Sequence, residues 1–135
     1  MLKKNLEKAM KEMGYYSLRP VQEIAYAKFK ENTSFALQAK TGAGKTVAFV
    51  LPCLEQIDET DANTQILMIS PTRELALQTA SKTKQLASYT TIPVITCIGG
   101  IPIDKQINAL RHRPQVIIGT PGRLLDLYTQ GYIHL

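Results

Sequence analysis

A single stretch decides the fold of this chain: Ala39-Lys40-Thr41-Gly42-Ala43-Gly44-Lys45-Thr46. Its spacing is that of a phosphate-binding loop, and it lies between an apolar run, 35–38, and an apolar helical pattern. Glycines let consecutive backbone N–H groups face one anion, a lysine adds a positive charge at the β- and γ-phosphates, and a threonine hydroxyl ligates Mg²⁺. The loop predicts binding of a nucleoside triphosphate, with Lys45 and Thr46 at the reacting phosphates and Thr46 on the metal.

Composition is that of an ordinary globular domain. Among 135 residues 44% are apolar and 20% are charged, which excludes disordered and fibrous classes. The net charge of +5 favours an anionic partner without identifying one. Cys53 and Cys97 lack metal-site or disulfide spacing, so we expect two small buried hydrophobes. The charged N-terminus and the lack of a long apolar run predict a soluble, cytoplasmic protein with no membrane partner.

Apolar runs alternate with helical patterns along the chain. The runs 35–38, 65–70, 93–98 and 115–119 predict strands, and continuous Ile, Leu and Val are typical of a parallel sheet buried on both faces. The prediction is an α/β fold with a doubly wound, mainly parallel sheet. The polar segment 58–63 predicts a solvated loop. Three helical patterns are expected, each with one face turned inward. The first would bury Leu2, Leu6, Ala9, Met10 and Met13, and the second Val21, Ile24, Ala25 and Phe29. The third would bury Leu75, Ala76, Thr79, Ala80, Thr83, Leu86 and Ala87.

The segments that follow the runs carry groups suited to phosphates. In parallel sheets ligands bind at the carboxyl ends of the strands. These segments are the loop 39–46, then 71–76, 99–100 and 120–123, and each offers backbone N–H groups, a hydroxyl or an arginine. Four such segments are more than one nucleotide needs, and they predict a second, longer polyanion beside the triphosphate.

The whole chain, 1–135, resembles the first RecA-like domain of a DEAD-box ATP-dependent RNA helicase, in incomplete form. Residues 39–46 match motif I in its A-x-x-G-x-G-K-T form, and 14–22 resemble the Q motif. Residues 71–76 resemble motif Ia, 99–100 the GG motif and 120–123 motif Ib. The order of the motifs is more specific than any one of them.

This resemblance implies a helicase that unwinds or remodels RNA, with ATP and Mg²⁺ as cofactors and with RNA and a second RecA-like domain as partners. Gln22 would pair with adenine and select ATP over GTP. The implied nucleotide-binding residues are Tyr15, Arg19, Gln22, Ala39, Lys40, Thr41, Gly42, Ala43, Gly44, Lys45 and Thr46. The implied RNA-binding residues are Pro71, Thr72, Arg73, Gly99, Gly100, Thr120, Pro121, Gly122 and Arg123, through backbone contacts with little sequence preference.

Three features depart from the family pattern. Lys40 replaces the usual Gln, and the isolated aromatic upstream of the Q motif would fall before residue 1. No run ends in the Asp or Glu that hydrolysis needs to hold Mg²⁺ and orient water, so the chain would stop before the D-E-A-D element and be inactive alone. Because the strand that carries this acid would lie inside the sheet, we expect reduced stability and self-association.

Two alternatives remain open at this point. One is another P-loop NTPase, such as a small nucleotide kinase, and the other is a non-catalytic module that binds nucleic acid. Taken singly, Gln22 is typical of a solvated side chain, Arg73 and Arg123 of surface arginines, and the glycines of simple turns. His112 and His134 lack ligand spacing and read as surface or packing residues.

Overall fold

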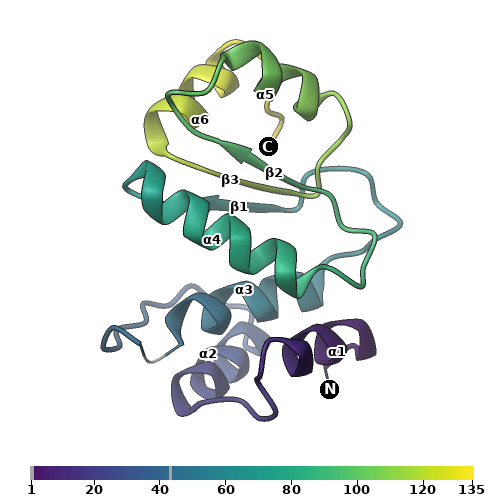
Figure 1. The fold of residues 1–135 in the computed structure, drawn as a ribbon, viewed down its shortest axis with the longest axis vertical. Helices are drawn as coiled ribbons and strands as arrows, with labels where there is room; N and C mark the ends of the chain where they lie inside the picture. The colour runs from purple at the N-terminus through teal and green to yellow at the C-terminus, as the bar shows by residue number, and fades with distance from the viewer. Residues whose placement is uncertain (1, 43) are drawn as a thin grey trace. The chain divides into compact units, whose positions relative to one another are not determined.

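The computed structural model describes residues 2–42 and 44–135, which divide into two compact units. The first comprises Met1–Gln56 and Gln85–Thr90, and the second comprises Ile57–Lys84 and Thr91–Leu135. The elements, in chain order, are α1 (Lys4–Glu12), α2 (Pro20–Lys30), α3 (Lys45–Gln56), β1 (Ile66–Ile69), α4 (Arg73–Leu86), β2 (Val94–Cys97), α5 (Ile103–Leu110), β3 (Val116–Gly119) and α6 (Pro121–Thr129) (Figure 1). No helix of the described part is long and apolar enough to cross a membrane.

Helices build the first unit. α1 buries Leu6, Ala9 and Met10, as its periodicity predicts, and α2 packs against α3. On α2 the buried residues are Gln22 and Ala25, whereas Ile24 is 57% exposed. The prediction that Ile24 points inward was therefore wrong. Each residue of a helix is turned by about 100° from the previous one, so a face that buries positions 22 and 25 turns position 24 outward.

The predicted strand at 35–38 is also wrong, since the structure has no strand there. A strand exists through hydrogen bonds to a neighbour, and no strand in the described part of the chain pairs with this segment. Phe35 instead meets Phe29 of α2 edge to face, with ring centroids 5.4 Å apart. The loop 39–46 thus follows an unpaired segment.

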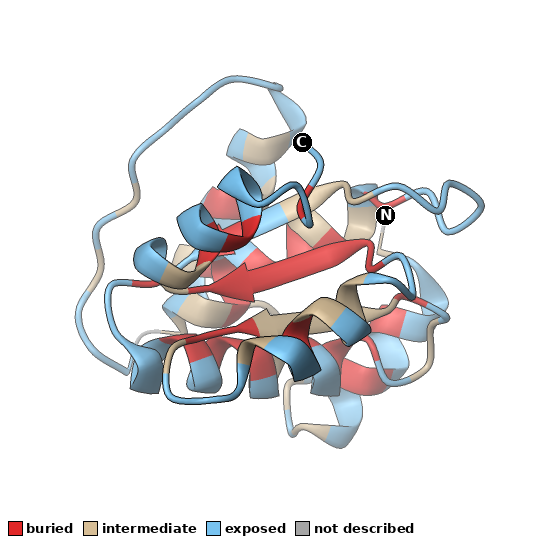
Figure 2. Cartoon of the chain, turned by 90° about the horizontal axis from the view of Figure 1, so that it is seen from above, coloured by how far each residue is buried: buried red, intermediate tan, exposed pale blue. Residues whose placement is uncertain are grey.

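A parallel three-stranded sheet forms the second unit, in the order β1-β3-β2. β3 lies between its two neighbours, and all four of its residues are buried. The fully buried strand stands out in red in Figure 2. Strands were predicted at all three places, and the parallel, helix-flanked sheet confirms the predicted fold class.

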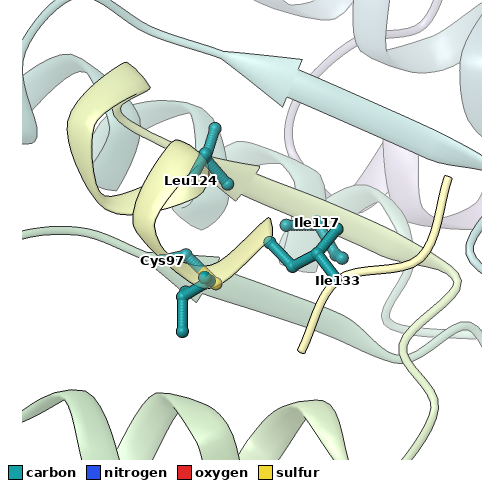
Figure 3. Close-up of a cluster of buried hydrophobic side chains, with 5 residues drawn as sticks. Cys97, Ile117, Leu124 and Ile133 are labelled. Carbon is teal, nitrogen blue, oxygen red and sulfur yellow. The ribbon is translucent and has the colours of Figure 1, made fainter. Parts of the chain in front are cut away.

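Helices cover both faces of this sheet (Figure 1). On one face, Oγ1 of Thr83 in α4 lies 4.0 Å from Sδ of Met68 in β1. On the other face, α6 contributes to a buried cluster, part of which Figure 3 labels. The members of this cluster are Cys97, Ile117, Leu124, Leu127 and Ile133. The inward stripe predicted for α4 is confirmed except at Leu75, which is 44% exposed.

Both cysteines are free thiols, as expected from their spacing. Cys97 is buried in the sheet, whereas Cys53 is only half-buried, so the prediction of full burial holds for Cys97 alone. Burial raises the pKa of each thiol to about 11, although the charge of Arg123 opposes the shift at Cys97. Both thiols are therefore protonated at neutral pH and are poor nucleophiles.

The cluster under α6 predicts a clear difference between two leucines. Leu127 is 0% exposed and Leu77 is 47% exposed. We expect Leu127→Ala to lower the free energy of unfolding by about 2–5 kcal/mol, because it removes buried methyl groups and leaves a cavity. Leu77→Ala, the matched control, should change it by less than about 0.5 kcal/mol. Urea unfolding followed by circular dichroism measures both, and equal effects would contradict this packing.

Candidate nucleotide and polyanion sites

The predicted phosphate loop leads directly into α3, which begins at Lys45. Gly42 and Gly44 have φ angles of +84° and +89°, the left-handed region that glycine adopts at little cost. The N–H groups of the first helical turn have no partners within the helix and are available to an anion. The predicted site residue Ala43 lies outside the described residues.

Two side chains of the Q segment donate hydrogen bonds to this loop. Nη1 of Arg19 lies 2.8 Å from the carbonyl oxygen of Gly42, and Nε2 of Gln22 lies 3.3 Å from that of Gly44. The structure thus brings together two predicted motifs that are separated along the chain. The contacts lie within the first unit.

Gln22 owes its position to the start of α2. Its Oε1 accepts a hydrogen bond of 2.9 Å from the backbone N–H of Arg19, in the manner of a capping box, and Pro20 occupies the first turn. The side chain is 1% exposed, so it is not the solvated glutamine that the residue type alone suggests. Its amide ties the beginning of α2 to the loop.

A side chain at Gly44 would meet Gln22 as well as strain the backbone. A Cβ at this position would lie 2.5 Å from Nε2 of Gln22, closer than real Cβ contacts come. A Cβ at Gly42 would meet nothing within 4 Å. Any side chain at position 44 would therefore displace Gln22, whereas one at position 42 would only strain the backbone.

The remaining predicted nucleotide residues lie in this loop or beside it. Lys45, Lys40 and Thr41 are exposed, and Thr46 and Ala39 are half-buried. The guanidinium carbon of Arg19 lies 5.7 Å from the ring centroid of Tyr15, which places a cation over an aromatic face. Within the described ranges, no group of three or more His, Cys, Asp or Glu residues could hold a metal ion.

The second unit brings the other predicted segments to one edge of its sheet. In the register, Ile69, Gly119 and Cys97 end their strands at the same level. The N–H of Ser70 donates to Gly119 O over 2.9 Å, and that of Thr120 donates to Cys97 O over 3.1 Å. Segments 71–73, 99–100 and 120–123 therefore leave the sheet side by side.

Arg73 lies against the glycine pair. A Cβ at Gly100, whose φ is +79°, would fall on the guanidinium group of Arg73, and one at Gly99 would lie 3.9 Å from Nη2. Thr72 caps α4, because its Oγ1 accepts a hydrogen bond of 3.2 Å from the N–H of Leu75. An exposed cation, a hydroxyl and a glycine backbone thus meet at the carboxyl end of β1 and β2.

Arg123 has a structural role that the sequence does not reveal. Its Nη1 donates to Ile101 O over 3.0 Å and to Oε1 of Gln106 over 2.9 Å. Gln106 is 4% exposed and donates from Nε2 to Ile98 O over 2.8 Å. The sequence does contain a signal for Gln106, which is a polar residue on the apolar stripe of α5, three positions after Ile103. Arg123 is therefore partly engaged within the unit.

Besides Gln106, Gly119 is a residue at this edge of the sheet whose role the sequence analysis missed. A Cβ there would collide with the carbonyl oxygen of Cys97 and would lie 2.9 Å from the side chain of Leu124. Glycine thus allows α6 to pack over the end of β3.

The chain is similar to ATP-dependent RNA helicases. It is 42% identical to CshA of Limosilactobacillus reuteri over 93% of this chain and 25% of that protein. It is also 42% identical to DbpA of Escherichia coli K12, over 93% of this chain and 28% of that protein. The chain thus spans about a quarter of the length of these curated relatives.

Solved structures show the same likeness. A hypothetical ATP-dependent RNA helicase from Sulfolobus tokodaii gives a TM-score of 0.86 at 35% identity, over 98% of this chain and 38% of that one. S. cerevisiae Dbp5, in a complex that contains ADP, gives 0.86 at 31% identity, over 100% of this chain and 36% of that one. Residues 19–134 match the family described as DEAD/DEAH box helicase. With this match and the motifs placed as described, the chain belongs to the DEAD/DEAH box helicase family.

Proposed function

We propose that this chain is the ATP-binding and RNA-binding part of an ATP-dependent RNA helicase that remodels or unwinds RNA duplexes. The observation that carries the proposal is the pair of hydrogen bonds from Arg19 and Gln22 to the phosphate loop. They join a side-chain amide suited to a base with a loop suited to phosphates. Relatives named as ATP-dependent RNA helicases support the same activity for the whole protein.

The loop supplies the phosphate end of the nucleotide site. In a trans peptide the N–H of Lys45 points opposite to the carbonyl of Gly44, and that carbonyl faces Gln22. The N–H of Lys45 is thus turned away from Gln22 and free for an anion at the start of α3. The exposed ammonium of Lys45 adds charge at the β- and γ-phosphates, and the Thr46 hydroxyl would hold Mg²⁺ together with phosphate oxygens. Bound Mg²⁺ would neutralise phosphate charge.

Gln22 retains the groups that adenine needs. A glutamine amide has two N–H donors and two acceptor lone pairs. One donor is used at Gly44 and one lone pair at the backbone of Arg19, so one donor and one acceptor remain. That combination matches the N7 acceptor and N6 donor of adenine, whereas guanine offers two acceptors on this edge. The ADP in the Dbp5 complex is consistent with an adenine nucleotide.

The second unit supplies the RNA contact. Arg73, Thr72 and the backbone at Gly100 present a cation, a hydroxyl and close backbone access at one sheet edge. Thr120, Pro121 and Gly122 follow β3 at the same level, and the donors of Arg123 that remain unused add to this surface. Contacts of this kind reach phosphates, so sequence preference is weak.

Hydrolysis would need groups beyond these residues. No strand of the described part ends in the Asp or Glu that would orient water, so we propose that the chain binds ATP without hydrolysing it. A second RecA-like domain would complete the cleft in the whole protein. We also propose a cytoplasmic location, which the two free thiols support.

Removal of the loop charge should weaken nucleotide binding. We expect Lys45→Ala to raise the Kd for ATP with Mg²⁺ roughly 10- to 100-fold, because a hydrogen bond to a charged group contributes about 1.5–3 kcal/mol. Titration with a fluorescent adenine nucleotide measures this. Lys4→Ala, which removes an equal charge from an exposed position of α1, is the control and should leave Kd unchanged. Equal affinity of Lys45→Ala and the wild-type chain would sink the proposed phosphate site.

Loss of the amide should abolish selectivity for adenine. We expect competition titrations to show the preference for ATP over GTP falling toward unity in Gln22→Ala, because the donor and acceptor that distinguish the bases are gone. Lys45→Ala serves as the comparison, since it should weaken both nucleotides and leave their ratio intact. If Gln22→Ala only loosened the loop, it would weaken the binding of ATP and of GTP equally. An unchanged ratio in Gln22→Ala would remove Gln22 from base recognition.

The RNA surface has a test based on salt. Arg73→Ala should weaken binding of single-stranded RNA to a similar extent for unrelated sequences, and it should lower the slope of log affinity against log salt by about 0.7. Fluorescence anisotropy measures both quantities. Arg111→Ala is the matched control, because this exposed arginine follows α5 and precedes β3, away from the carboxyl ends of the strands. RNA affinity that is indifferent to adenine nucleotide would favour the non-catalytic binding module instead.

A further inference from the structure

Gln106 is a buried polar residue that touches two of the segments assigned to RNA. Its Nε2 donates to the carbonyl oxygen of Ile98, which directly precedes the glycine pair, and its Oε1 accepts a hydrogen bond from Nη1 of Arg123. The side chain is only 4% exposed, which leaves no surface for direct contact with a phosphate. Any influence of Gln106 on a ligand therefore passes through the groups that it holds.

The orientation of this amide is determined by its two partners. A carbonyl oxygen only accepts hydrogen bonds, and a guanidinium group only donates them. The N–H groups of Gln106 must therefore face Ile98, and its oxygen must face Arg123. A rotated amide would set two acceptors against each other on one side and two donors on the other. An apolar side chain would serve neither partner.

The same two side chains hold both ends of the turn that contains the glycine pair. Gln106 binds the oxygen of Ile98, just before the glycines, and Nη1 of Arg123 binds that of Ile101, just after them. Because Gln106 also binds Arg123, the two ends of the turn are connected to the segment that follows β3. Two parts of the proposed RNA surface thus share one buried support.

Arg123 keeps the part of its guanidinium group that suits a phosphate. Arginine has five N–H donors, and the two on Nη1 are used at Ile101 and Gln106. The donors on Nε and Nη2 have no partner among the described residues. These two nitrogens form one edge of the planar group, which can bind two phosphate oxygens at once. Because Gln106 is neutral, it orients Arg123 without cancelling its charge.

We propose that Gln106 is a positioning residue for RNA, which orients the Nε and Nη2 edge of Arg123 toward a backbone phosphate before RNA binds. The inference rests on the proposed RNA contact at this edge of the sheet, and it adds a residue that does not touch RNA. A side chain that is already ordered loses less entropy on binding. Arg73 provides the contrast, because it is exposed and makes no hydrogen bond or ion pair within the described residues.

NMR of the arginine side chains tests the positioning without RNA. In the wild-type chain the order parameter of the Nε–H bond should be higher for Arg123 than for Arg73. In Gln106→Met the value for Arg123 should fall below about 0.6, the range of flexible groups. Methionine is unbranched and fills the apolar site, but it offers no comparable acceptor to the guanidinium group. Equal mobility of the two arginines in the wild-type chain, or an unchanged Arg123 in Gln106→Met, contradicts the proposal.

RNA binding tests the consequence of this positioning. Gln106→Met should weaken binding of single-stranded RNA roughly 2- to 10-fold, the cost of ordering one long side chain. In an Arg123→Ala background it should have no further effect, because the group that it positions is gone, whereas in Arg73→Ala its full effect should remain. Gln115→Met is the matched control. It removes a glutamine that is 3% exposed and precedes β3, at the opposite end of that strand, so RNA affinity should not change.

The outcomes separate this inference from the proposed function. RNA affinity that depends on Arg123 but not on Gln106 rejects the positioning role alone. An equal loss from Gln106→Met with and without Arg123 also rejects it, because Gln106 would then only support the fold. RNA affinity that is indifferent to both Arg73 and Arg123 overturns the proposed RNA surface, and this inference with it.

Discussion

The parallel pairing of β3 with strands on both sides is the constraint on which the second unit depends. β3 is fully buried, and β1 and β2 each pair with it but not with one another. Its register sets Ile69, Gly119 and Cys97 at one level. Three segments that are far apart in sequence thereby begin together at one edge. The charge and backbone groups that we assign to RNA are a product of this alignment rather than of any single segment.

Much of the fold could be predicted because its signals are local. Continuous aliphatic residues identified the three strands, and their lack of alternation identified a sheet buried on both faces. The segment 35–38 has the same signal and forms no strand, because pairing depends on a neighbour that local sequence does not specify. Ile24 and Leu75 show a similar limit. Helical periodicity gives a stripe, but packing decides which side of the stripe is covered.

The candidate sites show the same limit, because their local patterns could be predicted and their long-range contacts could not. The phosphate loop, its glycines and the segments after the strands were visible in the sequence, since each has a fixed spacing or follows a recognisable strand. The contacts that organise them were not visible. Gln22 reaches Gly44, Arg123 reaches Gln106, and Gly119 makes room for Leu124 only once the chain is folded. Contacts between side chains that are far apart in the chain leave no periodic pattern in the sequence. The exception is Gln106, a polar residue among the apolar positions of α5.

The contact between Arg73 and Gly100 has a consequence for the entropy of binding. A free arginine side chain has about 2 kcal/mol of rotamer entropy to lose when it grips a phosphate. Here the guanidinium already lies against a glycine that has no side chain to exclude it. Part of that ordering is thus completed when the chain folds, before any ligand arrives. Besides the backbone access that it offers, the glycine at position 100 would then assist binding indirectly, because it leaves room for the arginine to lie in this place.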